Sequence, residues 1–252
     1  MTVHITTTEA NAMQNPADLR WTHILLTVQT LVIILLSINR LSTLTLGYVA
    51  PNQFLRWVDL NNMLILPLIS LTAFYLLKQH LAYSSPAYQG LWHRTLGVIF
   101  ILGVYLTGTS YGDHEITNYL HGRFCATDPT TDLCRIVIFN DDEFSHWLFF
   151  TGFVLTNAVL MVLQVLFPWR TSLARGDVGL LVINGLFIGL GVFANLAFEQ
   201  IGLDLYVVAL LALLAIGLLW LWPATIAHLL QHSLLFGLNC HRSVQASVWP
   251  IK

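Results

Sequence analysis

Six long apolar runs, each followed by a polar stretch, constrain the fold of this chain more than any other feature. They cover about residues 21–38, 61–77, 95–111, 144–167, 178–198 and 203–222. A helix needs about 20 apolar residues to cross the hydrocarbon core of a bilayer, which is about 30 Å thick. The runs therefore predict an all-α, polytopic membrane bundle of six transmembrane helices, organised as a single transmembrane domain over residues 1–252.

A shorter seventh apolar run follows Pro223, from about residue 224 to 238. Proline removes one backbone hydrogen bond and can bend a membrane helix without ending it. The run is therefore either the kinked continuation of the sixth helix, which we favour, or a separate seventh helix that begins after the break at Pro223.

The composition agrees with an integral membrane protein and limits its partners. Hydrophobic residues make up 56% of the chain and charged residues only 10%, whereas a soluble domain carries about 25% charged residues. The formal net charge of -2 provides no basic surface for nucleic acid. Membrane lipids are the expected partners, together with a membrane protein under one of the alternatives below.

The distribution of lysine and arginine predicts the orientation, because these residues gather on the cytoplasmic side of a membrane. With the N-terminus inside, seven of the eleven basic residues lie inside and four outside. We therefore expect a multi-pass protein with both termini in the cytoplasm. The polar segment between the third and fourth runs then lies outside.

That polar segment, residues 112–143, is predicted to be an extramembrane acidic loop. The stretch from Ser110 to His146 contains seven of the thirteen acidic residues of the chain. Cys125 and Cys134 flank the turn-prone sequence ATDPTTDL. Because disulfides persist in oxidising compartments, an outer location predicts a disulfide between these two cysteines; two free thiols are the alternative.

Histidines and carboxylates gather at the same end of three predicted helices. If the third helix continues past its apolar run, the four polar residues Ser110, His114, Asn118 and His121 lie on one face. Neutral imidazoles and carboxylates are ligands of zinc and of non-haem iron. The sequence therefore predicts a metal site here. The predicted ligands are His114, His121, Asp142 and His146, and the predicted catalytic groups are Ser110, Glu143 and Glu199.

A structural role is the alternative for each of these residues taken singly, because histidines at helix ends often bond to backbone carbonyls. The remaining acidic side chains, among them Asp113 and Asp141, are expected to be solvated. Asp142 and His146 are four residues apart, so a regular α-helix would place them on one face.

Three motifs resemble those of the alkaline ceramidase and adiponectin-receptor group of membrane hydrolases, over about fifty residues. They are an S-x-x-x-H at the end of one helix, a D-E step at the start of the next and an H-x-x-x-H on the last. In this chain the motif residues are Ser110 and His114, Asp142 and Glu143, and His228 and His232.

The resemblance implies a zinc ion held by the serine, Asp142 and three histidines, and a water that cleaves a lipid amide. The chain departs from the family pattern in two respects. The gap between His114 and Asp142 is longer and contains the cysteines, and the orientation above places His228 and His232 near the opposite face of the membrane.

Three classes of function remain open. A membrane-embedded metal-dependent hydrolase acting on a lipid or lipid-like amide or ester is favoured by the clustered histidines and acids. A non-catalytic membrane subunit or scaffold would dock a partner through its outer loop. A proton or cation pathway would follow Asn184, Asn195 and Glu199. Haem ligation is a fourth interpretation, of the inner histidines His80, His93, His228 and His232.

Overall fold

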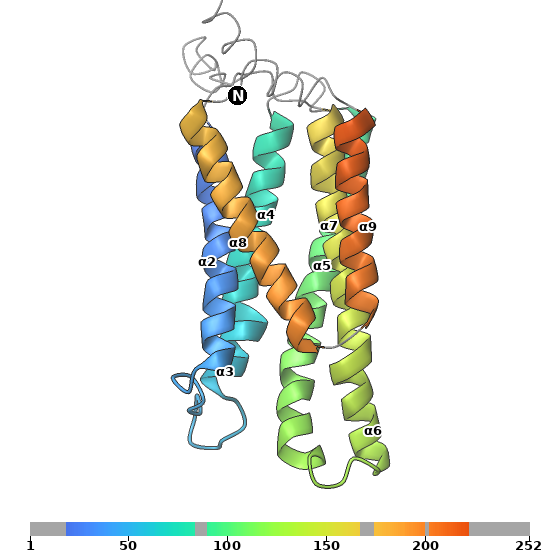
Figure 1. Ribbon diagram of the computed structural model, residues 1–252. Coiled ribbons are helices and arrows are strands. Elements are labelled where there is room, and N and C mark those ends of the chain that lie inside the picture. The colour runs from blue at the N-terminus through green and yellow to red at the C-terminus, as the bar shows by residue number, and fades with distance from the viewer. Residues whose placement is uncertain (1–18, 84–89, 167–173, 200–201, 222–252) are drawn as a thin grey trace, which may run out of the picture.

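The computed structural model describes residues 19–83, 90–166, 174–199 and 202–221. Over these residues the chain is a bundle of long helices (Figure 1), and the one β-type pairing is an isolated bridge between Tyr48 and Arg56. The long helices are α2 (Arg20–Leu41), α4 (Leu66–Tyr83), α5 (Leu91–Leu120), α7 (Ser145–Leu166), α8 (Arg175–Glu199) and α9 (Gly202–Leu221).

Three π-helical segments interrupt or extend these helices. Asn61–Ile65 joins the short α3 (Trp57–Leu60) to α4, and His121–Cys125 follows α5. The third, Asn140–Phe144, joins α6 (Asp132–Phe139) to α7. Each segment adds a wider turn to an otherwise continuous helix.

Four helical stretches among the described residues are long and apolar enough to cross a membrane. They are Arg20–Leu41, Trp57–Ala82, Leu91–Cys125 and Asp132–Leu166. These stretches contain the first four predicted runs and confirm an all-helical, membrane-type architecture. Helices α8 and α9 cover the fifth and sixth runs, but six crossings remain a prediction. The seventh run, with Pro223, lies outside the described residues.

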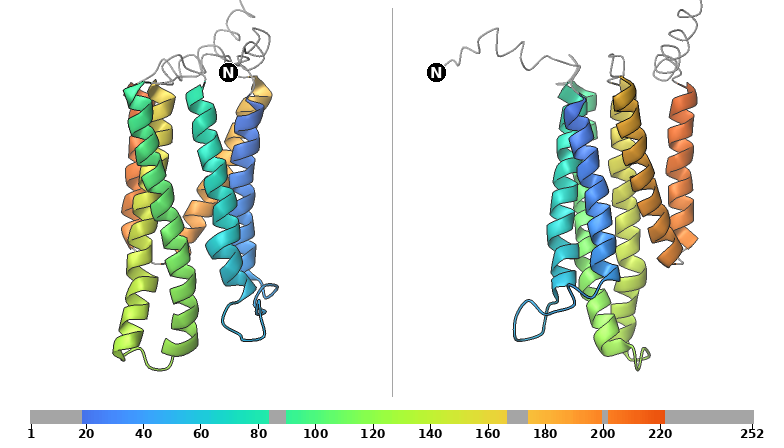
Figure 2. Two further views of the ribbon diagram at one scale, coloured as in Figure 1. Left: turned by 180° about the vertical axis from the view of Figure 1, so that it is seen from behind. Right: turned by 60° about the vertical axis from the view of Figure 1, so that its left-hand side comes forward.

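The two longest stretches form a hairpin that projects beyond the rest of the bundle. Leu91–Cys125 and Asp132–Leu166 each contain 35 residues, so each is about 52 Å long. Figure 1 shows α5 and α6 extending past the lower ends of α2, α8 and α9, and Figure 2 shows the same from two other sides. We call this lower end, which carries Cys125 and Cys134, the disulfide end.

The acidic segment 112–143 is therefore largely helical and not an irregular loop. Helix α5 runs through it to Leu120, and the chain leaves the helical conformation only at residues 126–131. The sulfur atoms of Cys125 and Cys134 lie 2.07 Å apart, at disulfide distance, as predicted. Both cysteines are buried and pack with Val137. The pair thus ties together the two arms of the hairpin near its tip.

Small residues hold α5 and α7 in close contact in the upper part of the hairpin. A Cβ atom at Gly152 would lie 2.4 Å from Oγ1 of Thr107 and 2.6 Å from the carbonyl oxygen of Gly103. Reciprocally, a Cβ atom at Gly103 would lie 2.6 Å from Oγ1 of Thr156. Interfaces of this kind let membrane helices approach backbone to backbone. The contact fixes the register in which the two helices meet at the disulfide end.

Helix α2 packs on both α4 and α8. Gln29 and Ser70 exchange hydrogen bonds between α2 and α4, with the Ser70 hydroxyl donating to Oε1 of Gln29 over 2.7 Å. Thr30 donates to Oδ1 of the buried Asn184 on α8 over 3.0 Å. Asn184 is thus used in helix packing, while the side chains of Asn195 and Glu199 lie outside the described residues.

Candidate functional site

One face of α5 carries polar side chains that contact the other arm of the hairpin at the disulfide end. Ser110 donates a 2.7 Å hydrogen bond to the backbone oxygen of Ser145. Below it, His114, Asn118 and His121 each reach Asp141. The prediction that these four residues share one face is confirmed, because α5 continues as a regular helix through Leu120.

Asp141 is the centre of this contact. Its side chain is 1% exposed, and its two oxygens contact different histidines. Nδ1 of His114 lies 3.1 Å from Oδ1, and Nδ1 of His121 lies 2.8 Å from Oδ2. The expectation that Asp141 is solvated is wrong. The hydrogen bond of His114 Nδ1 goes to the backbone oxygen of Asp141, over 3.3 Å, and that of His121 Nδ1 goes to the carboxylate. Asp141 thus fixes the orientation of both rings.

The π-helical segment Asn140–Phe144 explains why Asp141 and not Asp142 faces α5. A π-turn contains more than four residues, so Asp141 and His146, five residues apart, point to the same side. Both are buried, and Asp142 is exposed. The predicted pairing of Asp142 with His146 assumed a regular α-helix and is wrong for that reason.

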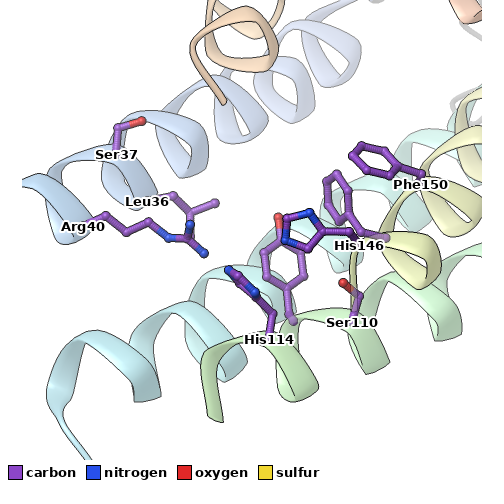
Figure 3. A pocket seen from close by; sticks show the side chains of 9 residues that line it. Leu36, Ser37, Arg40, Ser110, His114, His146 and Phe150 are labelled. Carbon is purple, nitrogen blue, oxygen red and sulfur yellow. The ribbon is translucent and has the colours of Figure 1, made fainter. Parts of the chain in front are cut away.

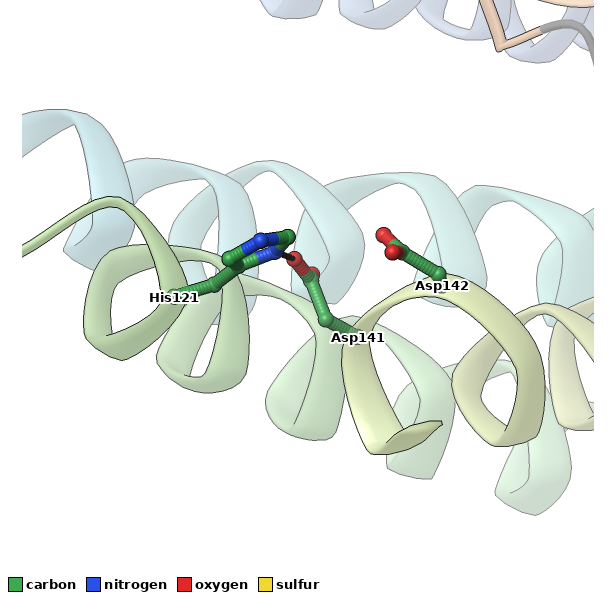
Figure 4. A group of neighbouring side chains, drawn as sticks. All are labelled: His121, Asp141 and Asp142. Carbon is green, nitrogen blue, oxygen red and sulfur yellow. Dashed lines mark hydrogen bonds and ion pairs between the residues drawn. The ribbon is translucent and has the colours of Figure 1, made fainter. Parts of the chain in front are cut away.

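Among the described residues, one group of three side chains is suited to hold a metal ion: His121, Asp141 and Asp142. One ligand atom from each lies within 4.8 Å of the other two. Figure 4 shows the imidazole of His121 against the carboxylate of Asp141, with the carboxylate of the adjacent residue Asp142 nearby. Zinc ligands lie at about 2.0–2.2 Å from the ion, so the exposed Asp142 side chain must turn inward to complete the site.

A cavity of about 110 Å³ lies beside this group, between α2, α5 and α7. One water needs about 10–15 Å³ of the same measure, so the cavity has room for a small chemical group. Its lining consists of Leu36, Ser37, Arg40, Ser110, Tyr111, His114, His146, Phe149 and Phe150. Figure 3 shows Arg40 reaching from α2 toward His114, with the ring of His146 close by.

His114 connects the cavity with the acidic group. Its ring lies 5.1 Å from that of His146, centroid to centroid, and meets it edge-on. The same ring bonds Asp141, which in turn contacts His121. The four predicted metal ligands are therefore divided into two adjacent groups, His121 with Asp142 and His114 with His146, and Asp141 bridges them.

The remaining predicted site residues lie in different parts of the chain. Ser110 lines the cavity, and Glu143 is exposed on the π-helical segment. Glu199 ends α8, but its side chain is outside the described residues. His228 and His232 also lie outside them, so the zinc set implied by the family resemblance stays a prediction.

An ion pair between Arg40 and Glu115 was missed from the sequence. Nη2 of Arg40 lies 2.6 Å from Oε1 of Glu115, whose side chain is 6% exposed. Nδ2 of Asn62 lies 3.4 Å from the second oxygen, Oε2. Opposite charges at the ends of two apolar runs were the available signal, but the helices that carry them are not consecutive in the chain.

The connection between α2 and α3 is fastened to the lower part of α5. The hydroxyl of Tyr119 donates to the backbone oxygen of Gln53 over 2.9 Å. The guanidinium of Arg56 lies 4.7 Å from the centre of the Tyr119 ring and also binds the buried Asp59. These contacts support α5 on the side away from α7 and help to hold the site residues in place.

No family model, curated protein or solved structure matches this chain.

Proposed function

We propose that this chain is a membrane-embedded, metal-dependent hydrolase that cleaves an amide or ester bond of a lipid or lipid-like molecule. The observation that carries the proposal is the group His121, Asp141 and Asp142. Asp141 of this group contacts His114. His114 in turn lines a cavity that has both polar and apolar side chains. Three protein ligands with one open position are typical of catalytic zinc sites.

The depth of the site supports a lipid substrate. From Leu91 to His114, and from Leu166 to His146, the helices rise about 34 and 30 Å at 1.5 Å per residue. That is about the thickness of the hydrocarbon core. Exposed aromatic residues gather at the same level, where Phe139 meets Phe144 and Trp147. Aromatic belts of this kind mark the membrane interface, where the bonds that link acyl chains to headgroups lie.

The residues present fit a zinc ion, or a non-haem iron, at the acidic group. His121 and the two aspartates would hold the ion, and a bound zinc supplies a water nucleophile that ionises near neutral pH. The backbone oxygen of Asp141 can only accept, so Nδ1 of His114 donates to it and Nε2 is left as the nitrogen that exchanges a proton with a reacting group. His114 is then the general acid and base, and Ser110 and His146 position the substrate in the cavity.

Purified protein tests this proposal with acyl amide and acyl ester substrates. Removal of metal with a chelator should abolish hydrolysis, and zinc should restore it. Asp142→Asn should lower the rate by at least about tenfold, whereas Asp132→Asn, at a fully exposed carboxylate of α6, should leave it unchanged. Hydrolysis that survives in metal-free protein, or an unchanged rate in Asp142→Asn, would contradict the proposal.

The alternative is a non-catalytic membrane subunit, and exposed apolar side chains on α6 favour it. Leu133 is 69% exposed and Ile136 is 60% exposed near the tip of the hairpin. A partner could cover them. Co-purification of a stoichiometric membrane protein, lost in Leu133→Ser with Ile136→Ser, together with absence of zinc, would decide for this alternative.

We also propose six membrane crossings, with both termini in the cytoplasm and the disulfide end outside. Support comes from the lysine and arginine distribution and from the cysteine pair, because disulfides persist in oxidising compartments. An engineered glycosylation site between Thr127 and Thr131 should be modified in this orientation. Modification at a site placed between α4 and α5 would contradict it.

A further inference from the structure

We infer that the cavity between α2, α5 and α7 binds the anionic headgroup of an acyl lipid, a phosphate or a carboxylate. The inference names the substrate class for the site proposed above. It rests on that proposal only for the statement that the bound lipid is cleaved, because binding in the cavity does not require a metal.

The charges around the cavity favour an anion. Among the described residues, its lining contains an arginine, two histidines and a tyrosine but no acidic side chain. The guanidinium of Arg40 carries five N–H donors in a planar fork that matches carboxylate and phosphate oxygens, and Glu115 accepts from one of its nitrogens, Nη2. The cavity wall thus presents donors and positive charge at membrane depth.

Glu115 lies behind Arg40 and not in the cavity wall. It accepts from Arg40 and is bonded on its other oxygen by Asn62, which belongs to the π-helical segment before α4. Asn62 is in turn bonded by Asn39 of α2 over 2.6 Å. This chain of contacts orients the guanidinium, and the carboxylate of Glu115 does not line the cavity, an arrangement that preorganises a binding group.

Part of the cavity lining is apolar and suits a lipid. Leu36 comes from α2, and Phe149 and Phe150 come from α7. Next to them on α2, the side chains of Leu35 and Ile38 are each 49% exposed. A charged headgroup can thus contact Arg40 while its acyl chain follows the apolar surface of the bundle.

The cavity is large enough for the headgroup of a lipid but not for the whole lipid. A volume of about 110 Å³ holds on the order of ten waters at about 10–15 Å³ each, which is enough for a phosphate or a carboxylate but less than a whole lipid with a long acyl chain. The chain must therefore extend from the cavity into the surrounding bilayer. This predicts little dependence of the affinity on chain length once the headgroup is bound.

Binding to metal-free protein in detergent tests the inference, with lysophosphatidate, a monoacylglycerol of the same chain and inorganic phosphate as probes. Lysophosphatidate should bind at least about tenfold more tightly than the neutral lipid, because hydrogen bonds to a charged group are worth about 1.5–3 kcal/mol each. It should also bind more tightly than inorganic phosphate, which lacks the apolar contacts.

The double variant Arg40→Gln with Glu115→Gln removes the charge without leaving a buried carboxylate unpaired. It should lose the preference for lysophosphatidate, whereas Arg135→Gln, at an exposed arginine of α6, should keep it. If the double variant does not fold, Ser110→Val provides the second test and should weaken binding by narrowing the cavity beside His114.

Equal affinity for the charged and the neutral lipid, or for inorganic phosphate and the lipid, would overturn the inference. So would full binding by the double variant. These outcomes are distinct from failure of the proposed hydrolase. A protein that binds lysophosphatidate but no zinc keeps this inference and loses the other, and a zinc-dependent hydrolase without a preference for charge does the reverse.

Discussion

The two halves of the α5–α7 interface use opposite means to hold the same pair of helices. In the upper half, Gly103 and Gly152 let the backbones touch, and hydroxyl groups such as that of Thr107 bond their own helix. In the lower half, Asp141 bonds side chains across the interface. The packed half supplies a fixed register, and the polar half uses that register to place ionisable groups.

The upper and lower halves of the interface also differ in helical geometry. The upper half is regular α-helix on both sides, whereas at the disulfide end each arm contains a π-helical segment, His121–Cys125 and Asn140–Phe144. Such segments are frequent at functional sites. The wider turn places Asp141 against α5 and turns Asp142 outward, so that neighbouring carboxylates have different environments.

The largest expected effect comes from Asp141. Asp141→Ala removes a buried carboxylate that contacts two histidines and should lower the free energy of unfolding by about 3–5 kcal/mol, because each contact to a charged group is worth about 1.5–3 kcal/mol. Asp142→Ala, at the adjacent exposed position, should change it by less than about 0.5 kcal/mol. Thermal unfolding in detergent compares the two variants. Similar losses in both would mean that the polar half does not depend on Asp141.

Loss of the disulfide should have the next largest effect. Cys125→Ser with Cys134→Ser opens a link between residues nine apart in the chain and should lower the free energy of unfolding by about 2–3 kcal/mol. We expect the loosening to be confined to the disulfide end. Hydrogen exchange should therefore rise near His121 and remain slow around Gly152; a uniform rise would show that the halves are not separable.

The packed half is tested by a matched pair of glycine substitutions on the hairpin. Gly152→Ala forces α5 and α7 apart and should lower the free energy of unfolding by about 1–3 kcal/mol. Gly112→Ala adds the same methyl group where no atom lies within 4 Å, and should be neutral or slightly stabilising because alanine favours a helix. Equal effects would contradict the close contact.

The smallest expected loss of stability comes from removing a single hydrogen bond between neutral groups. Thr30→Val removes the bond to Asn184 between α2 and α8 and should cost about 1 kcal/mol. Thr27→Val, at an exposed position of the same helix, should cost nothing measurable. A loss for Thr30→Val as large as that for Asp141→Ala would remove the distinction between neutral and ionisable contacts.

The part of the site that lies on α5 could be predicted because the helix is regular. Ser110 and His114 are four residues apart, and the 3.6-residue period places them correctly. The same period failed at Asn140–Phe144, because the sequence NDDEF carries no signal for a π-turn. The π-turn shifts the position that faces α5 by one residue. Asp141 is therefore buried there, and Asp142, which was predicted to face the site, is exposed.

The Arg40–Glu115 pair could not be predicted for a different reason. Arg40 ends α2 and Glu115 lies near the end of α5, so their contact depends on how helices that are distant in the sequence are arranged. Apolar periodicity predicts where helices begin and end but not which of them are neighbours. The cavity beside this pair therefore could not be predicted from the sequence, although three of its polar residues, Ser110, His114 and His146, are among the predicted site residues.

The most direct test of the metal proposal is the zinc content of purified protein after loading and removal of excess ion. The proposal predicts about one zinc per chain, lost in His121→Ala and in Asp142→Asn, and retained in Asp132→Asn. Equal zinc content in the wild-type protein and in both ligand variants would contradict a metal site formed by His121, Asp141 and Asp142.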